Sequence, residues 1–172
     1  MLSISTNYGP EVQRIPADSP MEDIIYLLKR DGGVFLKNLI PVADVEKAYE
    51  ECRERLENDV EWNGSFFPSW KHEIRDKLLM LHFDLRADTA GISPTSSQPY
   101  LCQNPAMRIR PGGKAQPLHR DDYISHNYHQ EIDCWNDVRD RNRETAVGLF
   151  VAGSKVTKEN GGTQFIPRSH LW

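Results

Sequence analysis

A histidine and an aspartate stand two residues apart in the segment 116–122, which reads QPLHRDD. Side chains at positions i and i+2 of an extended strand point to the same side of the strand. His119 and Asp121 could therefore direct an imidazole nitrogen and a carboxylate oxygen at one point. These groups are two of the three donors in a two-histidine, one-carboxylate iron site. A lone His-x-Asp pair is a weak signal, and the ordinary alternative is a surface histidine beside a loop aspartate.

Helices are predicted in the part of the chain that precedes this pair. Residues 19–22, SPME, form a capping box with proline at the first helical position, and Gly32 with its neighbour Gly33 ends the helix. Residues 34–36 predict a short strand, and Pro41 opens a second helix. The apolar residues expected on one face of the second helix are Val45, Ala48, Tyr49, Cys52 and Leu56. A third helix is predicted from about Trp70 to Leu85.

Strands are predicted in the second half of the chain. The strand-like segments are 106–110, 116–119, 146–152 and 163–166. Turns are expected at 111–113, Pro-Gly-Gly, and at 160–162, Asn-Gly-Gly, while 87–99 has the Pro, Ser and Gly content of a loop. Because helices come first and strands second, the fold class is predicted to be α+β.

Length and composition are those of one ordinary domain, predicted to span 1–172, with a helical lead-in at 1–86 and strands within 100–172. The net charge of −4 gives no support for a nucleic-acid-binding surface. No run approaches 18 apolar residues, so no membrane span is expected. The three cysteines are scattered, which suits a reducing compartment, and we expect the cytoplasm.

Three segments in chain order, QPLHRDD, ETAVGLFVAG and NGGTQFIPRSHLW, resemble the phytanoyl-CoA dioxygenase family, specifically its fungal secondary-metabolism branch. The segment VQRIPADSPMEDIIYLLKRDGGVFLKNLIP resembles the helical lead-in of that branch. The resemblance covers residues near 12–50 and 100–172. It implies an oxygenase that depends on Fe(II) and 2-oxoglutarate, built on a double-stranded β-helix (jelly-roll) core.

The resemblance also implies roles for individual residues. His119 and Asp121 match the first two iron ligands of the family. Gln116 matches a side chain that hydrogen-bonds 2-oxoglutarate, and Thr163 matches a hydroxyl that can do likewise. The alternative for Gln116 and Thr163 is a polar residue that flanks a strand. As ligands, His119 must be neutral at the binding nitrogen and Asp121 ionised, so metal binding competes with protons.

Other features of the family have no match in this sequence. The family's second iron-binding histidine and its 2-oxoglutarate-binding arginine follow the PRSHLW-type segment, within which this chain ends at Trp172. A further cofactor-facing arginine is expected after residues 66–68, where Arg75 is a poor match, and the segment from about 61 to 99 is shortened. His170 lies where the family has a histidine that is not a ligand. We therefore expect an incomplete iron site and an incomplete jelly roll in this chain.

Two functions follow from these matches and departures. The first is a supporting subunit that forms a heterodimer with a full-length oxygenase homologue. The second is a catalytic oxygenase in which another chain or a missing segment adds a histidine to His119 and Asp121. The departures favour the first, and a truncated product of a normal enzyme is a third possibility. By resemblance, the substrate is an apolar polycyclic natural product, a terpenoid or an alkaloid.

Overall fold

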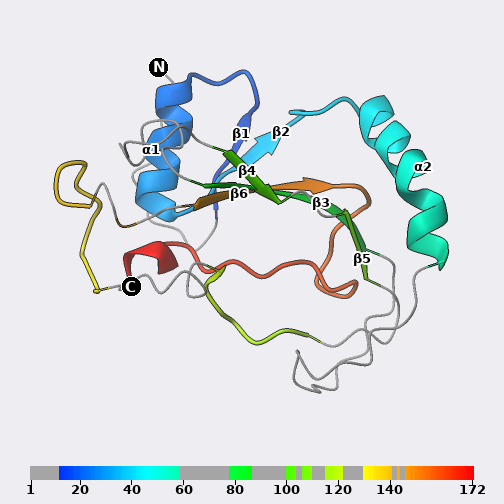
Figure 1. Ribbon diagram of the computed structural model, residues 1–172. Helices are drawn as coiled ribbons and strands as arrows, with labels where there is room; N and C mark the ends of the chain where they lie inside the picture. The colour runs from blue at the N-terminus through cyan, green and yellow to red at the C-terminus, as the bar shows by residue number, and fades with distance from the viewer. Residues whose placement is uncertain are drawn as a thin grey trace. The chain divides into compact units, whose positions relative to one another are not determined.

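A computed structural model describes most of the chain, in several ranges. The chain divides into two compact units. The described residues are 12–58, 78–86, 100–103, 106–109, 115–121, 130–140, 143 and 146–172. The first unit comprises Met1–Leu39, His129–Asn136 and Phe165–Trp172, and the second comprises Ile40–Tyr128 and Asp137–Gln164. Figure 1 labels the helices and strands of both units.

The first unit holds one helix and a pair of short strands. Strand β1 (Arg14–Pro16) pairs in parallel with β2 (Phe35–Lys37), and helix α1 (Met21–Asp31) connects them. The predicted strand at 34–36 is therefore confirmed with a shift of one residue, whereas β1 was not predicted. The guanidinium of Arg14 lies 4.1 Å from the ring centroid of Phe35, its partner in the register, so this pair adds a cation–π contact to the ladder.

Helix α1 ends as predicted but begins differently. Gly32 has a left-handed φ of 78°, and its N–H donates to the carbonyl of Leu28, which closes the last turn. At the other end, Pro20 is the N-cap, because its carbonyl accepts the first helical hydrogen bonds, and no side chain caps the helix. The predicted capping box is therefore wrong, since Ser19 lies one residue outside the cap position.

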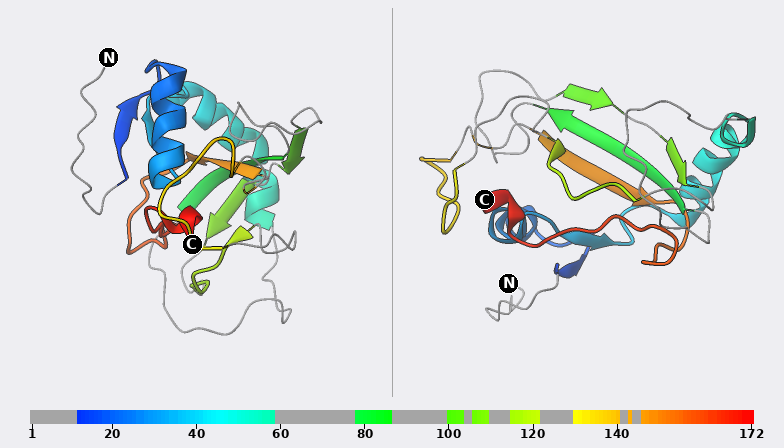
Figure 2. Two further views of the ribbon diagram at one scale, coloured as in Figure 1. Left: turned by 90° about the vertical axis from the view of Figure 1, so that its left-hand side faces the viewer. Right: turned by 90° about the horizontal axis from the view of Figure 1, so that it is seen from below.

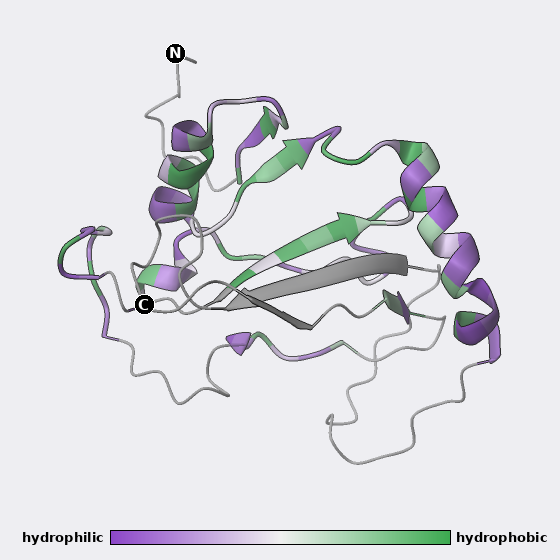
Figure 3. Ribbon diagram, turned by 45° about the horizontal axis from the view of Figure 1, so that its top comes forward, coloured by the Kyte–Doolittle hydropathy of each residue, from purple (hydrophilic) through white to green (hydrophobic). Residues whose placement is uncertain are grey.

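Helix α2 (Val42–Asn58) belongs to the second unit and follows Pro41, as predicted. Its half-buried residues are Val45, Ala48, Tyr49, Cys52 and Leu56, and the other residues of the helix are exposed. This is the apolar face that the 3.6-residue period predicts. In Figure 3 the apolar residues interrupt an otherwise hydrophilic helix.

An antiparallel sheet of four strands is the centre of the second unit. Its strands are β3 (Leu78–Arg86), β4 (Tyr100–Gln103), β5 (Ala106–Ile109) and β6 (Ala146–Ala152). One edge of β3 pairs with β6 along most of its length, and the other edge pairs with β5 at one end and β4 at the other. Figure 2 shows β6 alongside β3. Strand β3 therefore holds the sheet together.

The third predicted helix is wrong over the part that the structure describes. Residues 78–86, LLMLHFDLR, form strand β3 with three strand partners, and residues 70–77 lie outside the described ranges. The near-continuous apolar run fits a buried strand as well as a buried helix, and periodicity alone does not separate the two. The hydrogen bonds to β4, β5 and β6 decide the outcome. His82 consequently lies on a strand.

The other strand predictions have mixed outcomes. The strand at 146–152 is confirmed as β6, and the strand at 106–110 is confirmed as β5 over residues 106–109, while residue 110 lies outside the described ranges. Residues 116–119 and 163–166 are not strands, so these two predictions are wrong. Pro117 has no N–H to donate to a ladder. The segment 163–166 has no strand partner among the described residues. The segments 87–99 and 111–113 lie outside the described residues.

Strand β6 is buried on alternate residues. Val151 is buried and Val147 and Leu149 are half-buried, whereas Gly148 and Phe150 are exposed. This period of two is that of a strand with one face covered. Helices and an antiparallel sheet in this order agree with the predicted α+β class. Among the described helices, none combines the length and the hydropathy that a membrane crossing requires.

Candidate metal centre

His119 and Asp121 meet in an irregular, exposed stretch of the second unit. Nε2 of His119 lies 3.1 Å from Oδ1 of Asp121, and the two side chains are 50% and 71% exposed. The segment is not a strand, yet the spacing of two residues still brings the imidazole and the carboxylate together. The contact between the two predicted ligands is therefore present, on two side chains that are largely exposed.

A second contact fixes the histidine ring from the other side. Nδ1 of His119 lies 2.7 Å from the carbonyl oxygen of Pro117. A carbonyl oxygen only accepts hydrogen bonds, so Nδ1 must carry a proton and donate it. On the other side, Nε2 faces the Asp121 carboxylate, which is also an acceptor, so the ring lies between two acceptor oxygens.

The spacing of these atoms fits part of a metal site. Two donors bound at right angles, each about 2.1 Å from a first-row metal, lie about 3.0 Å apart, close to the 3.1 Å between Nε2 and Oδ1. A histidine nitrogen and a carboxylate oxygen also belong to the donor set of non-heme iron. Within the described ranges, however, no cluster of three or more His, Cys, Asp or Glu residues could hold a metal. The pair accounts for two ligands only.

Gln116 and Thr163, predicted to bind 2-oxoglutarate, are both exposed. Gln116 precedes His119 by three residues in the same irregular stretch. Thr163 lines an open groove of about 420 Å³. The other residues of this groove are Val156, Thr157, Lys158, Gly162 and Gln164. No hydrogen bond or ion pair of the described residues joins either side chain to His119 or Asp121, so their roles stay predictions.

The turn that precedes Thr163 is built around the buried side chain of Asn160, which is 4% exposed. Its Oδ1 accepts the Thr157 N–H at 2.8 Å, and its Nδ2 donates to the Lys155 carbonyl at 2.6 Å. The predicted turn at 160–162 is thus confirmed, with Gly161 at a φ of 80°. The role of the Asn160 side chain was not predicted, although asparagine before glycine is a turn signal.

The same turn also holds the exposed Glu159. The pKa of Glu159 is lowered, first by a hydrogen bond from its own backbone N–H and then by one from the Thr157 hydroxyl. Because the Thr157 oxygen in turn accepts the N–H of Asn160, the turn is a short hydrogen-bonded chain. These contacts hold the backbone that leads into Thr163.

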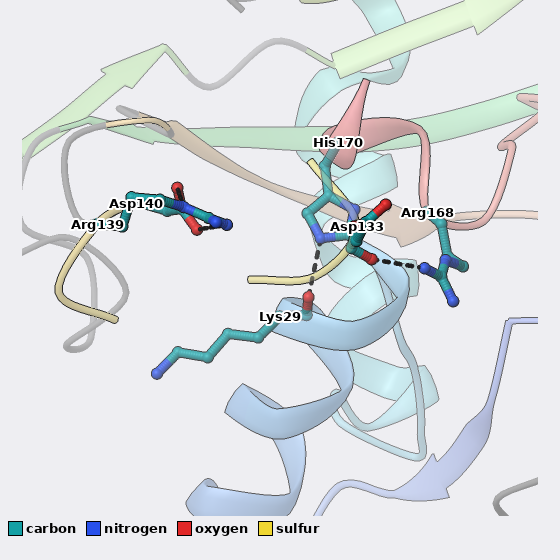
Figure 4. A network of polar contacts seen from close by, with 6 residues as sticks. All are labelled: Lys29, Asp133, Arg139, Asp140, Arg168 and His170. Carbon is teal, nitrogen blue, oxygen red and sulfur yellow. Dashed lines mark hydrogen bonds and ion pairs between the residues drawn. The ribbon is translucent and has the colours of Figure 1, made fainter. Parts of the chain in front are cut away.

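His170 takes part in a different network, in the first unit. Its Nε2 donates to the carbonyl of Lys29 at 3.0 Å, and its ring stacks on Trp135 with centroids 6.4 Å apart. Figure 4 shows the contact between His170 and Lys29. These contacts are those of a structural histidine, and the expectation that His170 is not a ligand stays a prediction. His72, His126 and His129 lie outside the described residues.

Arg168 and Leu171 extend this network, which we call the 168–171 clasp. The backbone N–H of Arg168 donates to the Asp31 carbonyl at 2.8 Å, and its guanidinium donates to the Asp133 carbonyl at 2.9 Å. Leu171 is buried, and its carbonyl accepts the N–H of Ile132. The clasp therefore joins three segments that are distant in the sequence. The sequence contained no signal for this pairing.

Asp31, whose backbone carbonyl accepts the N–H of Arg168, is a buried acid at the end of α1. It is 6% exposed, and the Arg30 guanidinium donates to both of its carboxylate oxygens at 2.5 and 2.7 Å. The hydrogen bond to Asp31 is the main cause that raises the pKa of Arg30. A buried carboxylate with a bidentate arginine partner is a satisfied charge, and it needs no metal or ligand to explain it.

The match to a family model identifies the class of protein. Residues 28–172 match the phytanoyl-CoA dioxygenase (PhyH) family, and the chain belongs to this family, in its fungal secondary-metabolism branch, as predicted. The fold of the family is a cupin-like jelly roll. The assignment of the strands of this chain to an incomplete part of that core stays a prediction.

Similar proteins include fungal dioxygenases. The chain is 30% identical to the dioxygenase swnH1 of Arthroderma benhamiae, over 98% of this chain and 62% of that protein. It is 28% identical to the multifunctional dioxygenase ausE of Aspergillus calidoustus, over 95% of this chain and 57% of that protein. The chain thus spans less than two thirds of the length of these relatives. No solved structure matches it significantly.

The alignment with swnH1 is longer than this chain, at 195 positions against 172 residues. That relative therefore carries additional residues inside the matched region. This agrees with the expectation of a shortened segment in this chain.

Proposed function

We propose that the chain supplies two ligands, His119 and Asp121, to the iron site of an Fe(II)- and 2-oxoglutarate-dependent oxygenase of fungal natural-product biosynthesis. The observation that carries this proposal is the convergence of Nε2 and Oδ1 to 3.1 Å. The family match supports the oxygenase class. We expect an apolar polycyclic small molecule, a terpenoid or an alkaloid, as the substrate.

Four residues of this chain would each have a separate role at the proposed site. His119 offers a neutral donor nitrogen, and Asp121 offers a negative charge that offsets part of the charge of the metal. Gln116 and Thr163 would donate hydrogen bonds from an amide and a hydroxyl to the carboxylates of 2-oxoglutarate. When bound, ferrous iron and 2-oxoglutarate supply the activation of O2 for oxidation of a substrate C–H bond. A histidine from outside the described residues, or from another chain, would complete the ligand set.

A supporting subunit is the second candidate function. It is favoured by the presence of only two donors at the pair, within the described ranges, and by exposed apolar side chains in the second unit. Leu118, directly beside His119, is 66% exposed, and Phe150 on β6 is 46% exposed. In this case a full-length homologue would carry its own complete site and cover these side chains. The contact would be large and apolar, above about 2,000 Å².

One substitution experiment separates the two functions. The chain is coexpressed with candidate full-length homologues, and turnover is measured with iron and 2-oxoglutarate after His119 and Asp121 are replaced by alanine in this chain only. Turnover that falls by orders of magnitude supports the proposal, because the metal cannot be held without these ligands. Turnover within a few-fold of the unsubstituted complex overturns it in favour of the supporting subunit.

Two controls keep this experiment decisive. Size-exclusion chromatography of each variant shows whether the complex still assembles, so that lost assembly is not taken for lost chemistry. Glu46→Ala removes an exposed carboxylate from α2 of the same unit and should leave turnover unchanged. Iron quantification per complex then shows whether the loss of turnover follows the loss of metal.

A further inference from the structure

Arg108 on strand β5 has a buried guanidinium nitrogen. All residues of β5 are half-buried, and Nη1 of Arg108 is shielded from solvent without a hydrogen-bond partner among the described residues. The guanidinium stays protonated in proteins, so its positive charge persists. A buried donor without an acceptor costs free energy, and folded proteins rarely retain one without a reason. The nitrogen therefore indicates an acceptor from outside the described part of the chain.

The strand register places Arg108 on the covered face of the sheet. Arg108 pairs with Leu79 of β3, and Val151 of β6 pairs with Leu81. Positions 79 and 81 are two apart on one strand, and directly opposite residues share a face, so Arg108 and Val151 project from the same face. Val151 is 9% exposed and marks the buried face of β6. The charge of Arg108 thus shares a face with apolar side chains, which cannot accept its hydrogen bonds.

We propose that Arg108 binds a carboxylate group of 2-oxoglutarate. This inference rests on the proposed oxygenase function. 2-Oxoglutarate carries two negative charges, and Gln116 and Thr163 offer it neutral donors only. A guanidinium adds a fixed positive charge and a planar fork of N–H groups that matches a carboxylate. Arg108 belongs to the same compact unit as Gln116 and Thr163, and it precedes Gln116 by eight residues.

A competing cation in this unit is Lys158, which lines the open groove together with Thr163. The side chain of Lys158 is exposed, so water hydrates its charge and weakens any ion pair that it forms. Nη1 of Arg108 is buried, and an ion pair there is stronger because the local dielectric constant is lower. Burial therefore favours Arg108 over Lys158 as the group that balances the charge of 2-oxoglutarate.

Titration of the full chain with 2-oxoglutarate, in the presence of Zn(II) as a redox-inert metal, tests the contact directly. Arg108→Met removes the charge and keeps an unbranched side chain, so it should weaken the binding of 2-oxoglutarate about 100-fold. Arg108→Lys keeps the charge but loses the fork, and it should weaken binding about tenfold. Arg55→Met is the matched control, because it makes the same exchange at an exposed position of α2.

Three outcomes of this titration would overturn the inference. The first is that the wild-type chain does not bind 2-oxoglutarate. The second is equal affinity in Arg108→Met and wild type. The third is a loss of affinity in Lys158→Met that Arg108→Met does not show, because the charge of 2-oxoglutarate would then be balanced in the groove.

Stability in the absence of ligand is a second and independent measurement. Replacement of an unpaired buried charge by an apolar side chain is neutral or stabilising, so Arg108→Met should have an unchanged or higher urea midpoint without ligand. Added 2-oxoglutarate should raise the midpoint of the wild-type chain and leave that of Arg108→Met unchanged. A lower midpoint in ligand-free Arg108→Met would mean that the guanidinium stabilises the fold itself, and the inference would be wrong.

The inference and the proposed function fail in different ways. If Arg108→Met loses 2-oxoglutarate binding while alanine at His119 and Asp121 leaves the turnover of the complex unchanged, the carboxylate site stands and the iron site does not. If turnover requires His119 and Asp121 while Arg108→Met binds 2-oxoglutarate normally, the inference alone is overturned. Weaker assembly of Arg108→Met with a homologue, at unchanged 2-oxoglutarate affinity, would also overturn it, because the acceptor would then belong to the other protein.

Discussion

Two histidines of this chain have opposite surroundings, although both occur in short polar motifs. His119 is 50% exposed and is held by contacts within two residues, with Nε2 facing a carboxylate. His170 is half-buried, donates to a carbonyl 141 residues away in the sequence, and stacks on Trp135. A candidate ligand needs a nitrogen that is left accessible beside a negative charge. A structural histidine uses its ring to connect distant segments.

The two segments should also differ in their tolerance of amino-acid substitutions. Around His119 the contacts are local and solvent-exposed, so side-chain changes there should alter chemistry with little effect on stability. In the 168–171 clasp the contacts are distant in sequence and partly buried, so changes there should alter stability first.

The largest effect is expected from alanine at the two histidines. His119→Ala should weaken metal binding by orders of magnitude and change the free energy of unfolding by less than about 0.5 kcal/mol. His170→Ala should do the reverse: it should lose about 2 kcal/mol of stability and retain metal affinity per folded molecule. Metal titration and urea denaturation of both variants measure the two quantities. Equal loss of metal binding in both would contradict the assignment of His170 as structural.

Gly32→Ala should be the most destabilising single change in the first unit, by about 3 kcal/mol. Gly32 has a φ of 78°, and a Cβ there would lie 2.5 Å from Nδ1 of His170. Strain in the backbone and displacement of the ring therefore add together. In the His170→Ala background the steric part disappears, and the cost should fall to about 1 kcal/mol. A cost that does not depend on residue 170 would mean that the ring does not rest against this glycine.

Asn160→Asp should destabilise the second unit by about 2 kcal/mol in a urea denaturation experiment. The carboxylate can still accept the Thr157 N–H, but it replaces the donor that reaches the Lys155 carbonyl at 2.6 Å with an acceptor. Lys155→Ala is the control, since it retains that carbonyl and removes an exposed side chain. If both variants have wild-type stability, the buried amide does not hold the turn.

Thr163→Val should have the smallest effect, on cofactor binding alone. Loss of one hydroxyl hydrogen bond costs about 1 kcal/mol, or about five-fold in the KM for 2-oxoglutarate, while stability should stay within about 0.5 kcal/mol because Thr163 is exposed. Gln164→Ala, at the neighbouring exposed residue, should leave KM unchanged. An equal KM in Thr163→Val and wild type would remove Thr163 from the proposed cofactor site.

Features that depend on neighbouring residues were predictable from the sequence. The apolar face of α2, the glycine at the end of α1, the Asn-Gly-Gly turn and the existence of strand β6 all follow from periods, propensities and turn chemistry that act over a few residues. The contact between His119 and Asp121 belongs to this group. Its spacing of two residues brings the side chains together even though the predicted strand does not form.

Features that need a distant partner were decided by the tertiary structure. Residues 78–86 suit a helix or a strand equally, and only the hydrogen bonds to three other strands select the strand. The segment 163–166 has no strand partner among the described residues and is irregular. The 168–171 clasp depends on carbonyl groups of residues 29, 31 and 133, and backbone groups have no sequence signature. Local chemistry therefore determined the candidate ligands, and long-range hydrogen bonding determined the framework around them.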